Sequence, residues 1–131
     1  MKNIIGIALL LVASLTLFGC GDKKPSDVAL DFYRAVEKQD VDKAYSMLYL
    51  NDDDAKNEMQ VKGKLQMIIG ETSGKMKQHG GTKDIVVKNE KASTDNTMTL
   101  VTLEVTFKDK TVKNETFRLR QKNKEWKVVL G

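Results

Sequence analysis

The chain has 131 residues, of which 40% are hydrophobic and 31% are charged, and its formal net charge is +4. This length allows one ordinary domain, and the balance of apolar and charged residues excludes a disordered chain. The net charge is modest and the sequence contains no nucleic-acid-binding motif, so we expect no nucleic acid partner.

The charged residues are unevenly distributed along the chain. Residues 22–58 hold ten acids and six bases, whereas residues 108–127 hold eight bases and three acids. An acidic first third and a basic end are typical of a solvated surface. A binding surface for an anionic envelope polymer or for lipid head groups is the alternative.

The chain begins with a segment typical of a secretory signal peptide. Lys2 is followed by a largely apolar run from Ile4 to Phe18. As a helix this run would span roughly 22 Å, which is less than the ~30 Å hydrocarbon core of a bilayer. We therefore predict that residues 1–19 are a cleaved signal peptide. A short membrane anchor is the alternative.

Cys20 is the only cysteine, so it cannot form an internal disulfide. Residues 17–20, Leu-Phe-Gly-Cys, resemble the lipobox of bacterial lipoproteins. The resemblance implies that the Cys20 sulfur receives a diacylglycerol and that a dedicated peptidase cuts between Gly19 and Cys20. It also implies that the new amine is acylated, for example with palmitate. Two or more acyl chains anchor a protein firmly. Residues 20–25 are then the lipidated cysteine and a tether.

The resemblance to lipoproteins also implies a location in the bacterial cell envelope. In organisms with two membranes, lipoproteins kept in the inner membrane carry Asp directly after the cysteine. Gly21 occupies that place here, and the first acid is Asp22. If the source has two membranes, the outer membrane is therefore favoured over the inner membrane.

Three helices are predicted after the tether from the spacing of apolar residues. The first runs from Ser26 to Lys38, directly after Pro25, which suits a helix start. The second runs from Val41 to Tyr49, with Asp40 as its N-cap. The third runs from Asp53 to Gln78, and its three glycines weaken it.

From Thr82 the apolar pattern changes from helical to alternating, which predicts strands. Helices followed by a run of strands indicate an α+β fold, with N-terminal helices packed on an antiparallel sheet of about four strands. We expect one such domain over residues 26–131. The predicted strands are one around Ile85 and Val87, then Thr97–Lys108, Val112–Gln121 and Trp126–Leu130, with turns at Asp109-Lys110 and Asn123.

Residues 25–48, PSDVALDFYRAVEKQDVDKAYSML, resemble the opening of a family of small bacterial lipoproteins whose single domain is a domain of unknown function. The ending from 123 to 129, NKEWKVV, is similar to the family's closing strand. The resemblance implies a cystatin-like, nuclear-transport-factor-2-like fold, in which a curved sheet wraps around helices. The matching positions in the opening are Phe32, Tyr33, Ala44 and Leu48.

Few residues indicate chemistry. His79, the only histidine, lies near the end of the third predicted helix, where it can interact with helix carbonyls. The acidic stretch from Asn51 to Asp54 lacks the spacing of a calcium loop and fits a helix cap better. We therefore expect no catalytic residue, no metal ion and no cofactor.

A candidate ligand site follows from the implied fold. Related scaffolds often have a pocket between the sheet and the helices, and the aromatic residues are its candidate lining. Core packing is the alternative role for the aromatic residues, and the two arginines of the third strand are candidates for an anionic ligand. The candidate ligand-binding residues are Tyr33, Tyr45, Trp126, Arg118 and Arg120.

Two functions are compatible with these observations. The first is a lipid-anchored envelope lipoprotein whose domain is a non-catalytic module for a ligand, an envelope protein or an anionic polymer. The alternative is a small pocket-type hydrolase or isomerase on the same fold, which rests on fold analogy alone. A pocket carboxylate with a raised pKa would favour the enzyme. A sheet–helix interface packed solid with aromatic side chains would count against it.

Overall fold

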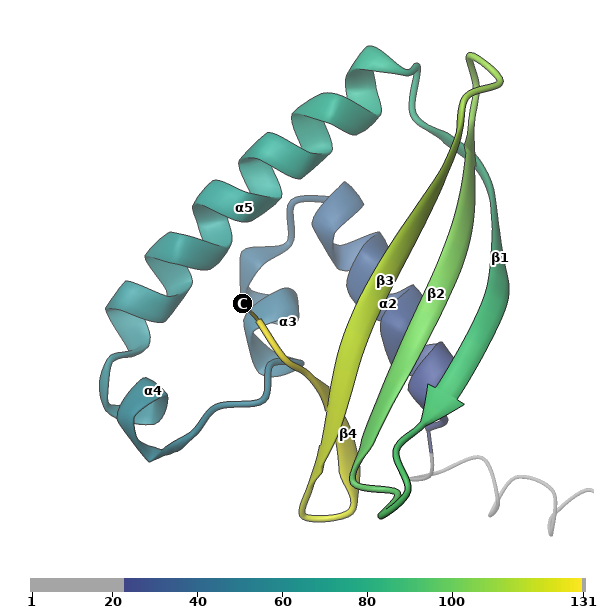
Figure 1. Ribbon diagram of the computed structural model, residues 1–131. Helices are drawn as coiled ribbons and strands as arrows, with labels where there is room; N and C mark the ends of the chain where they lie inside the picture. Colours follow the sequence, from purple (N-terminus) through teal and green to yellow (C-terminus); the bar gives the residue numbers. More distant parts are fainter. Residues whose placement is uncertain (1–22, 131) are drawn as a thin grey trace, which may run out of the picture.

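The structure, a computed structural model, describes residues 23–130. The predicted signal peptide and the predicted cleavage and lipidation positions, Gly19 and Cys20, lie outside the described residues. Within the described part, helices come first and strands follow (Figure 1). The elements are α2 (Pro25–Glu37), α3 (Val41–Ser46), α4 (Asp52–Lys56), α5 (Glu58–Gln78), β1 (Thr82–Ala92), β2 (Met98–Phe107), β3 (Val112–Lys122) and β4 (Glu125–Val128).

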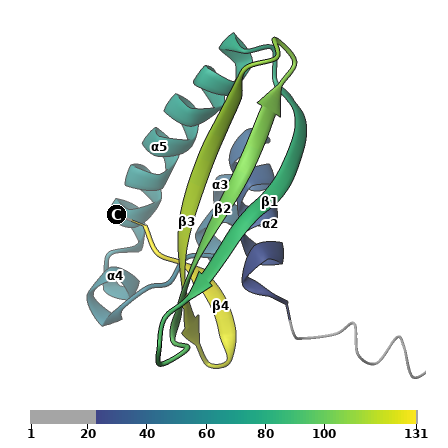
Figure 2. The ribbon, with the colours of Figure 1, turned by 45° about the vertical axis from the view of Figure 1, so that its right-hand side comes forward.

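Each strand pairs antiparallel with the next strand along the chain, so the sheet order is β1-β2-β3-β4. The helices lie on one side of this sheet, as both ribbon views show (Figures 1 and 2). The predicted α+β class, with helices packed on a four-stranded antiparallel sheet, is confirmed. No helix within residues 23–130 combines the length and the apolarity that crossing a bilayer requires.

The hydrophobic core lies between α2 and one face of β2. Val101, Leu103 and Val105 are fully buried, whereas Leu100 on the other face is 41% exposed. Successive side chains of a strand point to opposite faces, so this burial follows from the alternation in the sequence. The buried residues that α2 contributes are Val28, Ala29, Phe32, Tyr33, Ala35 and Val36.

The turn between β3 and β4 is built by Asn123 and Lys124, which both have positive φ, 52° and 67°. A two-residue turn with a left-handed backbone at both positions matches the twist of a hairpin. Asparagine adopts this conformation more readily than most residues, and lysine adopts it at a cost that glycine would avoid. The predicted turn at Asn123 is confirmed.

Helix α3 ends at Ser46, before the predicted end at Tyr49. The next three residues instead lie beside β4. The Val128 N–H donates to the Met47 carbonyl oxygen (2.8 Å), and the Tyr49 N–H donates to the Val128 carbonyl oxygen (2.7 Å). This parallel bridge buries Leu48 in the core. Burial and long-range pairing therefore override the local helical pattern.

The long helix predicted from Asp53 to Gln78 is in fact two helices, α4 and α5. Asn57 separates them with a non-helical backbone, and its side-chain amide donates to the Asp53 carbonyl oxygen (2.9 Å). Before the break, the Asn51 side chain accepts a hydrogen bond from the Asp54 N–H (2.8 Å) and caps α4. Helix α5 continues unbroken through its three glycines. The acidic stretch therefore caps a helix, as predicted.

Strand β1 follows the predicted alternation only as far as Val87. Ile85 is half-buried, whereas Val87 is 40% exposed. Both residues pair with buried residues of β2, Ile85 with Val105 and Val87 with Leu103, so they keep the predicted face, but β1 is the edge strand and Val87 is less covered. The register with β2 shifts after Val87, and a bulge of this kind redirects the side chains that follow. Beyond the shift, Glu90 accepts a hydrogen bond from the Ser26 N–H in the first turn of α2 (3.1 Å). The end of β1 therefore contacts the first turn of α2.

We expect Leu103→Ala to lower the free energy of unfolding by about 2–5 kcal/mol, because truncating a fully buried leucine leaves a cavity. Leu100→Ala is the matched control, since Leu100 lies in the same strand on the exposed face. We expect the control to lose less than about 1 kcal/mol. Urea unfolding measures both values, and equal losses would contradict the assignment of the two faces.

The loop between β1 and β2 contains a carboxylate that binds its own turn. Asp95 Oδ1 accepts hydrogen bonds from the Ser93 hydroxyl (2.7 Å), the Thr97 hydroxyl (2.8 Å) and the Thr97 N–H (3.1 Å). The Ser93 bond and the two Thr97 bonds lower the pKa of Asp95 from 3.8 to about 2. The ionised carboxylate therefore stabilises the folded loop.

This lowered pKa predicts a pH dependence. The stabilisation is present above the unfolded pKa and is lost as the pH falls through about 2. We expect Asp95→Asn to be less stable than the natural protein at neutral pH, with a difference that shrinks as the pH falls from about 4 to about 2. Asp52→Asn, an exposed carboxylate in the first turn of α4, is the control. Urea unfolding between about pH 4 and pH 2 measures the stability of both variants and of the natural protein. A stability difference for Asp95→Asn that stays constant with pH would refute the prediction.

Candidate functional site

A groove with a mainly apolar lining lies between α2, α5 and the outer edge of β3, and we call it the apolar groove. Its volume is about 210 Å³. Residues 115–118 of β3 and residues 128–130 form the side that faces the helices. The helical lining consists of Phe32, Tyr33 and Val36 from α2 with Ile68, Thr72 and Met76 from α5.

The apolar groove exists because β4 is shorter than β3. Strand β4 pairs with the last four residues of the β3 strand, from Leu119 to Lys122. Residues 112–117 have no strand on their outer side within the described part of the chain. Helix α5 faces this uncovered stretch, but it packs on α2 and α3 (Figure 1). Side chains alone therefore fill the space between α5 and β3, and they leave part of it open.

The floor of the apolar groove carries one buried hydroxyl group. Tyr33 is 2% exposed, and its hydroxyl lies 2.9 Å from the Thr82 hydroxyl at the start of β1. Burial raises the pKa of Tyr33 above its ordinary value of 10, against the smaller effect of the Thr82 hydrogen bond. The phenol is therefore neutral at physiological pH. It contributes a fixed aromatic ring to the groove.

A second hollow, the polar groove, continues from the apolar groove toward the turn between β2 and β3. The two grooves share Thr72, Met76 and Glu115, and the polar groove has a volume of about 350 Å³. Lys75 and Lys113 also line it. The Lys113 ammonium lies 3.3 Å from the Glu115 carboxylate. The joined grooves therefore run from an apolar end to an end bordered by lysines.

His79 closes the far end of the polar groove. Its Nδ1 lies 2.7 Å from the Asp109 carboxylate, and its ring stacks on Phe107 with the ring centroids 4.9 Å apart. The Thr111 N–H also donates to Asp109, and this bond together with the His79 contact lowers the pKa of Asp109 to about 2. The His79 ring thus joins the end of α5 to the β2–β3 turn through a carboxylate, while its contact with the helix carbonyls is made by its backbone N–H, which donates to the Met76 carbonyl oxygen (3.1 Å).

The five predicted ligand-binding residues do not form one site. Tyr33 and Arg118 line the apolar groove. Tyr45 lies on α3, where a lysine ammonium of α5 is 5.0 Å from its ring centroid. Arg120 is exposed on the face of β3 that points away from the core. Trp126 lines a separate groove at the other end of the sheet.

Sequence reasoning missed the residues of α5 and β3 that form the two grooves. Glu115 shares a strand face with Phe117 and Leu119, which pack toward the helices. A charged residue on an otherwise apolar strand face is a signal that could have indicated a cavity there. On α5, Ile68 and Thr72 fit the same helical periodicity as the core residues. The sequence contains no signal that separates them from the core.

Known proteins resemble this chain in sequence and in fold. The sequence matches a family described as a domain of unknown function (DUF4878) over residues 18–129, a range that includes Gly19 and Cys20. A search of curated proteins finds no match. Among solved structures, the fold is similar to the crystal structure of a Campylobacter jejuni protein described as a candidate NTF2-like transpeptidase.

This structural likeness has a TM-score of 0.72 and a sequence identity of 22%, and it covers 83% of this chain and 100% of the other chain. At this level of identity the likeness shows the fold alone, and it confirms the nuclear-transport-factor-2-like arrangement that the sequence resemblance implies. Because the family match spans most of the sequence, the chain belongs to the DUF4878 family of domains of unknown function, and its fold is NTF2-like.

Proposed function

We propose that this protein is a lipid-anchored module of the bacterial cell envelope that binds an elongated ligand in the apolar and polar grooves. The observation that carries the proposal is the continuity of the two grooves through Thr72, Met76 and Glu115. One end is apolar, and the other end is bordered by lysines. A ligand with an apolar body and an anionic end matches this arrangement.

The size of the apolar groove limits how such a ligand is placed. Its volume of about 210 Å³ is smaller than the roughly 300–1,000 Å³ that is usual for small-molecule sites. A ligand of ordinary size therefore extends from the apolar groove into the polar groove. The apolar body would contact Ile68 and the ring of Phe117, and its burial would contribute about 25 cal/mol for each Å² removed from water.

The charges of the polar groove favour an anionic end on the ligand. Lys75 pairs with Glu71 at 3.4 Å, and Lys113 pairs with Glu115 at 3.3 Å. The two lysine side chains are 62% and 54% exposed, so both ion pairs are screened by water and salt. Exposed ion pairs of this kind are weak. An anionic ligand group can therefore replace the glutamates as the partner of the two lysines at little cost in free energy.

The lipid anchor is the second part of the proposal. The family match extends across Gly19 and Cys20, so the proposed cleavage point belongs to the matched region. Helix α2 begins at Pro25, five residues after Cys20, which would keep an anchored domain at the membrane surface. Residues 1–19 are the proposed signal peptide, and the outer membrane is the favoured location where two membranes are present. An envelope protein or an anionic polymer remains a candidate partner.

The hydrolase or isomerase alternative has less support. A pocket carboxyl group whose pKa is raised by burial would favour such an enzyme. Among residues 23–130, the carboxyl groups with displaced pKa values are Asp95 and Asp109, and both values are lowered. Phe32 and Phe107 are buried, and Tyr45 and Trp126 pack against the core, so aromatic side chains fill much of the interface and count against an enzyme pocket there. The grooves therefore support binding better than they support catalysis.

A substitution at the junction of the grooves tests ligand binding. We expect Thr72→Phe to lower the affinity for anilinonaphthalene sulfonate, an apolar dye with an anionic group, by at least about tenfold, because the new ring fills the junction. Gln66→Phe adds the same ring to an exposed position of α5 outside both grooves and should leave the affinity unchanged. Dye titration measures binding, and thermal unfolding checks that both variants fold. Unchanged dye binding by folded Thr72→Phe would refute the groove as the site.

A substitution at the proposed attachment point tests the anchor. We expect Cys20→Ser to abolish incorporation of labelled fatty acid and to stop maturation, because serine lacks the sulfur that accepts the diacylglycerol. Gly21→Ala, which keeps the cysteine, is the control and should be labelled normally. Cell fractionation follows both proteins. If Cys20→Ser protein without label still fractionates with membranes, residues 4–18 are themselves the anchor.

A further inference from the structure

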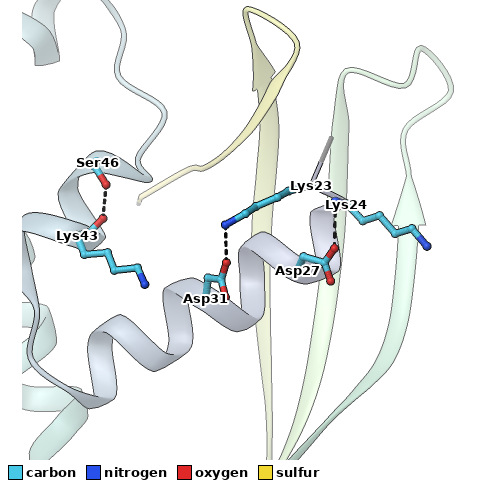
Figure 3. Close-up of polar contacts among 6 residues, drawn as sticks. All are labelled: Lys23, Lys24, Asp27, Asp31, Lys43 and Ser46. Carbon is cyan, nitrogen blue, oxygen red and sulfur yellow. Dashed lines mark hydrogen bonds and ion pairs between the residues drawn. The ribbon is translucent and has the colours of Figure 1, made fainter. Parts of the chain in front are cut away.

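A third groove lies between α2, the end of α3 and β4, and we call it the lysine groove. Its volume is about 330 Å³. Lys23, Lys124 and Lys127 line it together with the ring of Trp126. Figure 3 shows Lys23, at the start of the described chain, beside α2 with its ammonium 3.0 Å from the Asp31 carboxylate. The groove thus combines three cations and one carboxylate, that of Glu125, with an aromatic ring.

Two further cations adjoin the lysine groove on the outer face of β3. Arg120 lies directly opposite Lys127 in the ladder between β3 and β4. The charged groups of Arg120 and Lys122 lie 5.2 Å and 5.7 Å from the centroid of the Tyr49 ring. The Lys122 ammonium also donates a hydrogen bond to the Leu50 carbonyl oxygen (2.7 Å). Both residues are exposed, so these cations are positioned by the protein and still face water.

The carboxylates around the lysine groove are already engaged. Asp31 binds Lys23, and Glu125 binds Lys127 at 3.4 Å. The carboxylate of the adjoining β1–β2 loop is bound within its own turn. All three carboxylates keep their negative charge, and the five cations of the surface outnumber them by two. Of the five cations of this surface, Arg120, Lys122 and Lys124 have no carboxylate partner among the described residues.

The proposed anchor lies close to this surface by chain length alone. Lys23 follows Cys20 by three residues. A fully extended chain spans at most about 3.6 Å per residue, so Cys20 lies within roughly 11 Å of Lys23 in any conformation. The attraction between exposed charges extends over about 8 Å at physiological ionic strength. A lipid on Cys20 would therefore hold the lysine groove near the charged surface of the bilayer.

We propose that the anchored domain docks on anionic phospholipid head groups through the lysine groove, Arg120 and Lys122, with Trp126 at the level of the head groups. Ammonium and guanidinium groups attract lipid phosphates, and each contributes appreciably near an anionic membrane. A tryptophan ring suits this layer because it is apolar and also carries an N–H donor. The proposal rests on the lipid anchor proposed above, and it does not depend on the ligand of the other two grooves.

Docking in this way sets the direction in which the ligand grooves open. Lys113 in the polar groove and Lys122 beside the lysine groove are nine residues apart on β3. At about 3.3 Å per residue this separation is roughly 30 Å. The polar groove therefore lies at the end of the sheet far from the bilayer, near the β2–β3 turn (Figure 1). A ligand in the envelope space could enter it while the domain is docked.

The fluorescence of Trp126 tests the docking. Trp126 is the single tryptophan, so its emission reports on the lysine groove without labelling. The purified natural protein is combined with phosphatidylcholine vesicles that contain or lack phosphatidylglycerol, and quenching by brominated lipid is recorded. We expect a blue shift and quenching with phosphatidylglycerol only, and both should reverse at about 1 M salt, where the screening length is about 3 Å. Mass spectrometry of the same sample detects acyl chains on Cys20, which distinguishes a missing anchor from missing docking.

Two lysine variants provide a matched pair. Lys124 and Lys110 are both exposed turn residues with positive φ, 67° and 75°, and their turns lie at opposite ends of β3. We expect Lys124→Glu to lower the ratio of docked to free domain by about 30-fold, because it replaces one attraction by one repulsion, each worth roughly fivefold near an anionic surface. Lys110→Glu should leave the ratio unchanged. Arg120→Gln, with an expected loss of about fivefold, is the second variant if Lys124→Glu does not fold.

Three results would overturn the proposal. Equal Trp126 signals with neutral and anionic vesicles would show that head-group charge plays no part. Equal losses in the Lys124→Glu and Lys110→Glu proteins would show that the effect is not local to the lysine groove. A signal reproduced by soluble glycerol phosphate without vesicles would show that the groove binds a free anion instead of a membrane.

Discussion

The burial of one face of β2 beneath α2 is the constraint on which the rest of the structure depends. Leu103 and Val105 are fully buried on that face, and β2 is the strand with which both β1 and β3 pair. A shift of register by one residue would turn the apolar face to water, so the pairing of all three strands is strongly specified. On α2, the Phe32 ring meets the Phe117 ring of β3 edge to face, with the centroids 5.9 Å apart. This contact sets the position of β3 relative to the helix.

The grooves follow from how far this core extends. Helix α2 covers the middle of the sheet, and α5 packs on α2 and α3. Strand β4 is only four residues long, so the first half of β3 has a helix near it but no further strand among the described residues. The apolar lining of the gap continues the core, whereas Glu115 and Lys113 are charged. The apolar surface that is covered elsewhere in the core is therefore open as a groove beside the part of β3 that β4 does not pair with.

Cations lie at both ends of the sheet. The end near the β3–β4 turn carries Arg120, Lys122 and Lys124 without carboxylate partners in the described part of the chain. The other end carries the lysines of the polar groove, which are paired with glutamates, and Lys108 and Lys110 of the β2–β3 turn, which have no such partner among the described residues. What distinguishes the first end is its nearness to the proposed anchor, so an anchored domain of this kind would present that end to the membrane and its ligand grooves to the envelope space.

Much of the fold could be predicted from the sequence, because each of the correct expectations depended on local patterns. The alternation around Leu103 and the helical spacing around Phe32 predict which side chains are buried, and Asn123 predicts a turn, without reference to distant residues. The early end of α3 could not be predicted, because Leu48 leaves the helix to pair with β4, 80 residues later. The contact of His79 with Asp109 could not be predicted either, because the two residues are 30 positions apart in the sequence.

The sequence by itself therefore determined the class of fold, the buried faces of β2 and β3 and the segment that the proposed anchor occupies. Only the tertiary structure decided which candidate residues share a site. It separated Tyr33 from Trp126 and placed Glu115 in a groove with Thr72 of α5. The physical reason is that periodicity records whether a side chain faces the core or the solvent. It does not record the length of the neighbouring strand, and here the short β4 leaves the groove open.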